Sequence, residues 1–258
     1  MWGVVLLHIL LTNDDGILAP GIKALWQELS QFARITVVAP DSEKSASSQA
    51  ITVHHPIWVD EHPLDVADIC AWRVGGTPTD CVKVALESLL ADDLPDIIVS
   101  GINQGSNMGT DVLYSGTVSA AIEGALHGLP AIAMSLDSWE TFDFEPAAKT
   151  ARKVIETMIN RSLPPNTLLN VNVPALPESQ LKGIAITKLG VRNYENTFER
   201  RQDPRGRTYY WMSGRVSETE NAPDSDIVAV QNGKISITPI HFDLTNYGIM
   251  SALGTWGL

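Results

Sequence analysis

The stretch Val4–Leu11 (VVLLHILL), followed at once by Thr12–Gly16 (TNDDG), decides the fold of this chain. A continuous apolar run is typical of a strand that is covered on both faces, as in a parallel sheet. In such a sheet, ligands bind at the carboxyl ends of the strands. Asp14 and Asp15 would lie there, where two adjacent ionised carboxylates need a compensating charge. Because Mg²⁺ and Mn²⁺ prefer oxygen ligands, the pair predicts a metal site; the alternative is an ordinary turn or helix cap.

Strand-like and helix-like segments alternate from this stretch up to about residue 175. Apolar residues recur at helical spacing over 20–29, and 34–39 is a short apolar run that ends at a proline. Further strands are expected at 51–59, 69–74, 96–100, 131–135 and 168–173, and further helices at 79–90, 117–127 and 147–159. This alternation predicts an α/β fold built on a doubly wound, mostly parallel sheet.

The character of the sequence changes after about residue 175. Residues 190–226 are polar, and strand-like pieces at 183–188, 208–212 and 235–238 predict β-hairpins. We therefore expect two parts: a core over residues 1–178, and a C-terminal β-hairpin region over residues 179–258 that packs back on it. A projecting arm of this kind is often an oligomer contact, although a plain loop or a lid is equally compatible with the sequence.

Composition excludes several classes of protein. The chain has 258 residues, 44% of them hydrophobic and 19% charged, which are globular values. Its net charge of −12 argues against binding a nucleic-acid polymer, because such proteins normally carry a basic stripe. Cys70 and Cys81 are too few for a disulfide framework or a thiolate zinc site. The N-terminal apolar run is too short to span a membrane and lacks the marks of a signal peptide, so we expect a cytoplasmic location and no membrane partner.

A second polar loop, Ser100–Gly109 (SGINQGSNMG), follows the strand expected at 96–100 and so lies at the same sheet edge as the acidic pair. Its glycines allow the backbone to approach a ligand closely. Asn103 offers a neutral oxygen to a metal and an amide group to a phosphate, and Ser106 and Asn107 could join it around phosphoryl oxygens. The alternative is a Gly- and Asn-rich loop that only turns the chain.

Two more segments belong to this edge. Tyr114–Thr117 (YSGT) precedes the helix expected at 117–127, and the free N–H groups of a helix N-terminus favour an anion, so Ser115, Gly116 and Thr117 predict a phosphate site. An ordinary Ser or Thr cap is the alternative. Asp41–Ser48 (DSEKSASS) follows the second strand, and its Ser45 could add a hydroxyl ligand to the metal. A solvated Ser-rich loop explains that segment equally well.

Taken together, these motifs resemble the SurE family of stationary-phase survival proteins with nucleotidase activity. The matching pieces follow one another in family order: Thr12–Gly16, Ala39–Asp41 with Ser45, Gly76–Pro78 with Asp80 and Cys81, Ser100–Gly109, Ser115–Thr117 and Ile237–Pro239. Each piece alone is unspecific. Their combination is highly specific, and it spans nearly the whole chain.

The resemblance implies a Rossmann-like core and a C-terminal β-hairpin arm that builds homodimers or homotetramers in the cytoplasm. It implies a phosphomonoesterase that hydrolyses nucleoside 5′-monophosphates, and also 3′-monophosphates, to nucleoside and phosphate. One divalent cation per subunit, Mg²⁺ or Mn²⁺, is expected on Asp14, Asp15, Ser45 and Asn103. The expected catalytic residues are Asp14, Asp15 and Asn103, and phosphate contacts are expected from Asn13, Ser106, Asn107, Ser115, Gly116 and Thr117.

Two rival classes also place acidic residues after a first strand. A phosphatase of the haloacid dehalogenase type requires Asp-x-Asp there, whereas Asp14 and Asp15 are adjacent. A signalling receiver domain requires a phosphoacceptor aspartate after a later strand, where this chain offers Asn103 and Ser135. A receiver domain is also only about half as long as this chain. The sequence leaves open whether one aspartate acts as a general base or as a nucleophile, and it shows no clear general acid.

Overall fold

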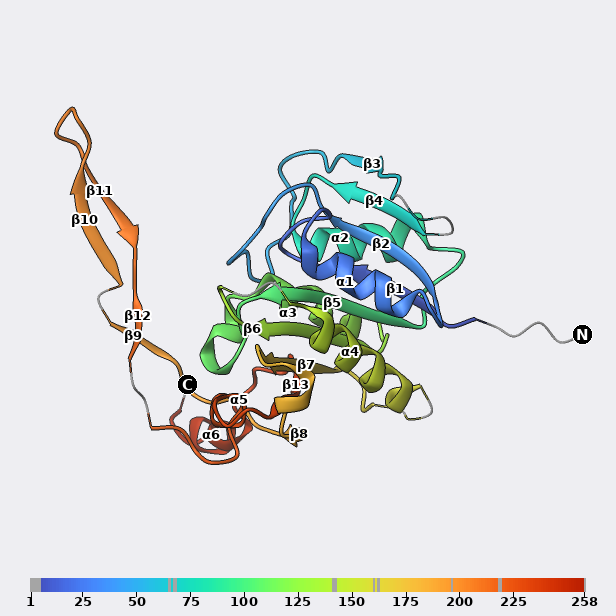
Figure 1. Ribbon diagram of the computed structural model, residues 1–258. Helices are drawn as coiled ribbons and strands as arrows, with labels where there is room; N and C mark the ends of the chain where they lie inside the picture. The colour runs from blue at the N-terminus through green and yellow to red at the C-terminus, as the bar shows by residue number, and fades with distance from the viewer. Residues whose placement is uncertain are drawn as a thin grey trace, which may run out of the picture.

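A nine-stranded sheet runs through the centre of the molecule in the order β3-β4-β2-β1-β5-β6-β7-β13-β8 (Figure 1). The structure, a computed structural model, describes residues 6–64, 66, 69–140, 143–159, 161, 163–195, 197–217 and 220–257. The six central strands are parallel: β1 (His8–Thr12), β2 (Arg34–Pro40), β4 (Cys70–Val74), β5 (Ile97–Gln104), β6 (Ala131–Asp137) and β7 (Thr167–Pro174). The chain starts in the middle, builds outward through β2 and β4, and then returns to β5. The predicted doubly wound sheet is therefore confirmed, with its switch point between β1 and β5.

The remaining strands complete the two edges of the sheet. β3 (Val59–Glu61) is antiparallel to β4 at one edge. At the other edge, β13 (Ile235–His241) is antiparallel to β7, and β8 (Ile184–Ile186) is parallel to β13. The chain after residue 178 thus supplies strands to the same sheet as the core, while the domain boundary expected at that residue stays a prediction.

Helices cover both faces of the sheet because successive strand residues point in opposite directions. Ile9 and Leu11 pack with α1 (Pro20–Leu29) and α4 (Glu145–Met158) in one apolar cluster. Leu10 packs with α2 (Pro78–Val84) and α3 (Gly116–Leu126) in the cluster on the other face. The shorter elements are η1 (Ala85–Leu89), η2 (Gly109–Leu113), η3 (Glu178–Gln180), α5 (Asp226–Gln231) and α6 (Tyr247–Leu253). Within the described ranges, no helix is long and apolar enough to cross a membrane.

Several predicted elements differ from the structure. Of the three strand-like pieces that predict β-hairpins, only 208–212 lies in one, because those at 183–188 and 235–238 supply β8 and β13 to the edge of the central sheet. The strand expected at 51–59 is absent except for Val59, because Thr52 donates from its backbone N–H and its hydroxyl to the Asp80 carboxylate, at 2.9 and 2.6 Å, rather than to a neighbouring strand. The helix expected at 79–90 is regular only to Val84 and continues as the π-helical η1. The first strand begins at His8, and residues 4 and 5 of the predicted run lie outside the described residues.

The C-terminal region carries the predicted hairpin arm, which extends away from the body of the molecule (Figure 1). β10 (Phe198–Gln202) and β11 (Thr208–Met212) form its outer antiparallel pair, and β9 (Asn193–Glu195) and β12 (Arg215–Ser217) form the pair at its root. Every residue of the outer pair is exposed, including its aromatic side chains. A two-stranded hairpin by itself is only marginally stable in water, so this arm lacks the apolar cover that strands normally need.

Candidate functional site

The candidate site lies at the carboxyl edge of the sheet, over the switch point between β1 and β5. Thr12 and Ser100 are neighbours in the register of these two strands, so the segments that follow them emerge side by side. Asp14 and Asp15 follow β1, and Asn103 stands near the end of β5. The sheet therefore brings the acidic pair and the amide-rich loop together, as the sequence predicts.

Asp14 is buried beneath the first turn of α3. Its Oδ1 accepts a hydrogen bond of 2.5 Å from the hydroxyl of Thr117. Burial raises the pKa of the Asp14 carboxyl, and the Thr117 hydroxyl opposes that rise. Gly116 allows the helix to approach this closely, because a Cβ there would lie 2.8 Å from the Asp14 Cβ and 2.9 Å from its Oδ2. The helix N-terminus is thus built against the carboxylate.

Asp15 lies beside Asp14 and is less deeply buried. Burial, together with the charge of Asp14, raises the pKa of Asp15 to about 6. The backbone N–H of Gln104, which donates to Asp15 Oδ2 at 3.3 Å, opposes this rise. Among the described side chains, no lysine or arginine forms an ion pair with either carboxylate; the nearby Lys44 pairs with Asp41 instead, at 3.7 Å. The two acids therefore repel each other with no cation of the protein to compensate them.

Asn103 is presented to this pair by an irregularity in β5. The register with β6 shifts between Ser100 and Asn103, where the Gly101–Ile102 peptide bond is cis. Gly101 has a φ of +136°, and a side chain there would collide with the carbonyl oxygen of Met134. The Asn103 amide nitrogen donates to the Gly105 carbonyl at 2.7 Å, and among the described residues no donor reaches its Oδ1. That oxygen is therefore free to act as a neutral ligand.

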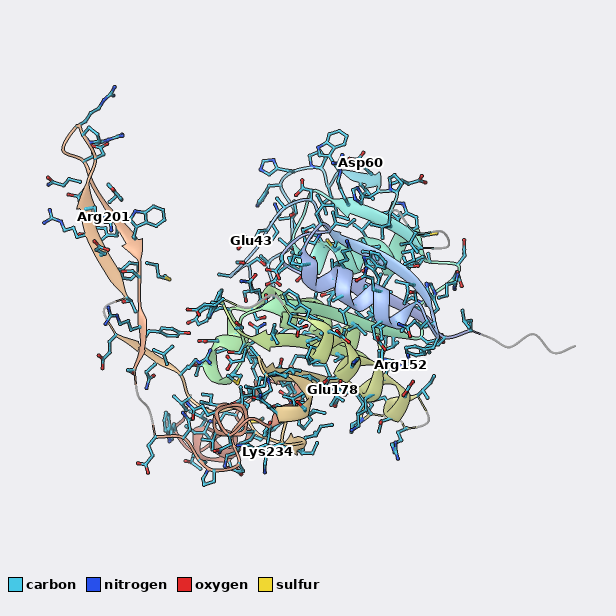
Figure 2. All side chains as sticks on the ribbon, in the orientation of Figure 1. Glu43, Asp60, Arg152, Glu178, Arg201 and Lys234 are labelled. Carbon is cyan, nitrogen blue, oxygen red and sulfur yellow. The ribbon has the colours of Figure 1, made fainter. Side chains whose placement is uncertain are left out.

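Ser45 lies on the exposed loop 41–50, which crosses over the site. The loop is held to the acidic pair by the Lys44 N–H, which donates to the Asp14 carbonyl at 2.7 Å, and the Ser45 hydroxyl donates to Glu43 Oε1 at 2.7 Å. Figure 2 shows Glu43 at this edge of the core, and its charge raises the pKa of both Asp14 and Asp15. Ser45 is thus bonded to Glu43, a third acid whose role the sequence analysis did not single out.

Three of the predicted phosphate-binding side chains make hydrogen bonds within the fold, and their contacts with phosphate stay predictions. Asn13 is fully buried and bridges the turn after β1, donating to the Gly16 carbonyl and accepting from the Gly16 N–H. The Ser115 hydroxyl caps α3 by accepting from the Val118 N–H at 3.1 Å. Asn107 is buried and donates to the Ser135 hydroxyl at 2.9 Å. These contacts fix the positions of the loops around the acidic pair.

Ser106 is held by a residue that sequence reasoning missed. The guanidinium of Arg192 donates to the Ser106 hydroxyl at 3.1 Å and pairs with Asp111 at 3.0 Å. Tyr194 donates to the same Asp111 carboxylate at 2.5 Å. The site therefore includes a mostly buried cation from the root of the arm, one residue before β9. No local motif marks Arg192, since it meets Ser106 only through the tertiary fold.

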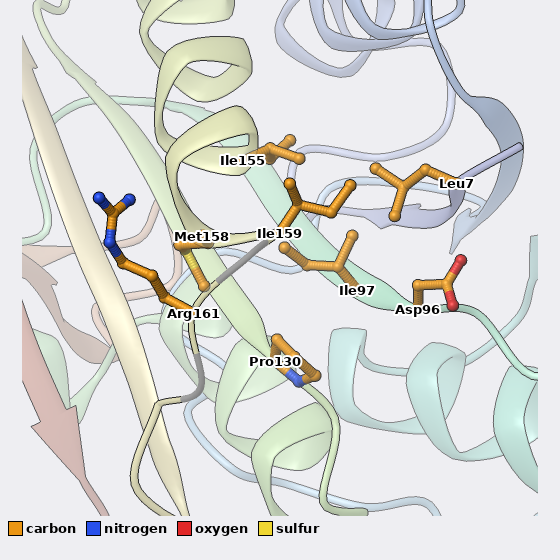
Figure 3. A pocket seen from close by; sticks show the side chains of 8 residues that line it. All are labelled: Leu7, Asp96, Ile97, Pro130, Ile155, Met158, Ile159 and Arg161. Carbon is orange, nitrogen blue, oxygen red and sulfur yellow. The ribbon is translucent and has the colours of Figure 1, made fainter.

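A cavity of the core lies at the opposite edge of the sheet, where the strands begin. Its volume is about 380 Å³, and Figure 3 shows Asp96 and Arg161 on either side of an apolar lining. The lining residues are Leu7, Asp96, Ile97, Pro130, Ile155, Met158, Ile159 and Arg161. None of them belongs to the polar loops described above, so this cavity is separate from the candidate site.

The donor set at the carboxyl edge fits an oxygen-preferring divalent cation. Asp14 and Asp15 supply carboxylates, Asn103 supplies an amide oxygen, and Ser45 is a hydroxyl on the covering loop. Within the described ranges, no three His, Cys, Asp or Glu side chains gather closely enough to hold a metal by themselves. Mg²⁺ is commonly bound by one or two carboxylates and keeps several waters, which matches a site with two acids.

Comparisons with known proteins agree with this geometry. The family model for the survival protein SurE matches residues 9–196. The chain is 54% identical to the 5′-nucleotidase SurE of Heliobacterium modesticaldum, covering 97% of this chain and 92% of that one, and 52% identical to that of Carboxydothermus hydrogenoformans, covering 97% and 96%. The crystal structure of the SurE protein from Aquifex aeolicus superimposes with a TM-score of 0.83 at 38% identity, covering 95% of this chain and 98% of that one. Sequence and fold agree over nearly the full length, and the chain belongs to the SurE family.

Proposed function

We propose that this chain is a metal-dependent phosphomonoesterase that hydrolyses nucleoside 5′-monophosphates, and also 3′-monophosphates, to nucleoside and phosphate. The observation that carries the proposal is the buried pair Asp14 and Asp15, which has no compensating cation and lies beside a helix N-terminus and an amide-rich loop. The relatives' name, 5′-nucleotidase SurE, supports the class of substrate.

One divalent cation per subunit, Mg²⁺ or Mn²⁺, would be held by Asp14, Asp15 and the Oδ1 of Asn103. Ser45 would join them once its hydroxyl leaves Glu43. When bound, such a cation offsets the charge of the phosphate group and lowers the pKa of water. Thr117 keeps the Asp14 carboxylate in a fixed orientation through its hydroxyl, and the Asn103 amide is oriented by the Gly105 carbonyl.

The phosphate group would lie between the acidic pair, Ser106 and the first turn of α3. The positive end of that helix and the backbone around Gly116 favour an anion there. Arg192 adds a guanidinium behind Ser106, with its charge shared with the Asp111 carboxylate that holds it. These donors are in place before substrate arrives, so they can stabilise charge on the phosphoryl oxygens without rearranging.

We also propose that the arm joins subunits into a homodimer or homotetramer. The support is the uncovered outer pair of strands, in which Phe198, Tyr210 and Trp211 are exposed on a hairpin that has no core of its own. The two free cysteines are compatible with the cytoplasmic location that we propose for the enzyme. Light scattering on the purified protein tests the assembly, since a monomer at micromolar concentration would contradict it.

The experiment that tests the function is phosphate release from a panel of nucleoside 5′- and 3′-monophosphates. We expect release to stop with a chelator and to return with Mg²⁺ or Mn²⁺. Asp14→Asn should abolish turnover while the protein keeps a cooperative melt, because the fold does not depend on that charge. Activity that survives both the chelator and Asp14→Asn would overturn the proposal. Release with a stable aspartyl phosphate on the protein would instead favour the dehalogenase type.

A further inference from the structure

An exposed tryptophan lies next to the candidate site on the side of β6. Trp139 is the second residue after β6, and 77% of its surface is exposed. The six-membered ring of its indole lies over Gly105: a Cβ on this glycine would be 2.6 Å from Cζ2 and 2.8 Å from Cη2 of the ring. Gly105 has a φ of +101° and no side chain, so the backbone leaves room for the indole at that place.

Gln104 connects this ring to the acidic pair. Its backbone N–H lies 3.3 Å from Asp15 Oδ2, and its side-chain amide donates to the Trp139 carbonyl at 3.2 Å. One residue thus contacts both the carboxylate and the segment that carries the indole. The backbone that carries the ring is therefore tied to the loop of the candidate site, and the ring itself lies over Gly105 and remains open to solvent.

The opposite side of the site is closed. Loop 41–50 passes over Asp14 from β2 and is fastened at both ends: the Lys44 N–H donates to the Asp14 carbonyl, and the Ser48 hydroxyl donates to the Leu113 carbonyl at 2.8 Å. A substrate whose phosphate lies at the acidic pair therefore has its free path over β5 and β6. That path leads to Trp139.

We propose that Trp139 is the stacking platform for the nucleobase and a specificity-determining residue of this enzyme. The inference rests on the proposed nucleotidase function and adds the position of the base. Aromatic rings bind bases by stacking, which tolerates different bases because each has a π-face. A site that recognises its substrate in this way discriminates nucleotides from sugar phosphates more strongly than one base from another.

The test compares AMP with ribose 5-phosphate, which is the same phosphomonoester without its base. Trp139→Ala should raise KM for AMP roughly five- to hundred-fold with little change in kcat, because a contact made equally in the ground and transition states affects binding alone. Turnover of ribose 5-phosphate should stay within about two-fold, and Trp139→Phe should retain most of the AMP affinity. Trp58, which is exposed by 73% and whose carbonyl accepts from the Gly75 N–H at 2.8 Å, is the matched control.

Three results would overturn the proposal: equal losses for AMP and ribose 5-phosphate, no loss for either, or a loss with Trp58→Ala and none with Trp139→Ala. Should the wild-type protein hydrolyse neither compound, the nucleotidase function fails, and calorimetry decides the question of the base separately. Weaker AMP binding by Trp139→Ala than by the wild type would then still support the platform. Equal AMP binding, or no AMP binding by either protein, would refute it.

Discussion

Replacing Asp15 by asparagine should stabilise the metal-free protein, although the residue is proposed to serve the site. Burial and the charge of Asp14 raise the pKa of Asp15 from its ordinary 3.8 to about 6. At 1.36 kcal/mol per pKa unit this shift corresponds to about 3 kcal/mol, and partial solvent screening reduces it to about 1–2 kcal/mol. Because the folded pKa is the higher one, the folded state holds the proton more tightly than the unfolded chain. The metal-free protein therefore loses stability as the pH rises from about 4 to about 6.

The assay is chemical denaturation of the chelator-treated wild type and Asp15→Asn at two pH values. At pH 7.5 the variant should be more stable by about 1–2 kcal/mol, because the asparagine removes both the cost of burying the Asp15 charge and its repulsion with Asp14. At pH 5 that gain should fall to about half, because pH 5 lies between the two pKa values: Asp15 is then largely protonated in the folded wild type but still ionised in the unfolded chain. The control is Asp60→Asn: Asp60 is exposed and pairs with Arg73 at 3.2 Å, so its loss should change stability by less than about 0.5 kcal/mol.

Adding Mg²⁺ should reverse the order of the two proteins. A cation that binds only the folded state at a hundred times its Kd adds about 2.7 kcal/mol to the wild type. Asp15→Asn lacks one of the two carboxylates and should gain much less. An Asp15→Asn protein that is less stable than the wild type without metal, or equally stabilised at pH 5 and pH 7.5, would refute the electrostatic reasoning.

Two further substitutions test the packing and the charge around the site. Gly116→Ala places a methyl group 2.8 Å from the Asp14 Cβ, so we expect a loss of about 1–3 kcal/mol in stability together with a fall in phosphate release from AMP per folded molecule. Gly124 lies in the same helix but faces the core, where a Cβ would be 2.4 Å from Cδ1 of Ile98 in β5, so Gly124→Ala should cost stability while leaving the activity per folded molecule unchanged. Arg192→Met keeps much of the apolar stem but removes the charge behind Ser106, and it should raise KM for AMP and ribose 5-phosphate alike. An effect of Arg192→Met on AMP alone would place the guanidinium at the base instead of the phosphate.

The sequence predicts the parts of this molecule that local periodicity and strand order determine. The helix at Pro20–Leu29 and the parallel strands appear where apolar spacing places them, and the switch point follows from their order. The acidic pair is predictable because two adjacent carboxylates after a buried strand are costly without a ligand. The failures have a different cause. At Thr52 the backbone bonds to the Asp80 carboxylate, a contact between distant segments that no local pattern encodes.

Local patterns are also insufficient to predict the hydrogen-bond partners of the site residues. Asn13 and Ser115 are marked by motifs at the correct edge of the sheet, yet their polar atoms are used within three residues along the chain, by the turn and by the helix cap. The residue types indicate where in the fold these side chains lie, because polar groups of this kind gather at strand ends. They do not indicate which atoms the side chains bind. Arg192 is the converse case: no motif surrounds it, and only the fold brings it to Ser106.

The position of Arg192 gives the arm a direct connection to the site. It is the last residue before β9, and its backbone exchanges hydrogen bonds with the Thr110 hydroxyl while its guanidinium bridges Asp111 and Ser106. A change in the direction of the arm at its root would therefore move a positive charge at the proposed phosphate position. The hairpin lacks a core of its own, so its direction depends on what covers it. The proposed assembly through the arm and the proposed phosphate site thus share one side chain, and we expect Arg192→Met to weaken phosphate binding while leaving the oligomeric state of the protein unchanged.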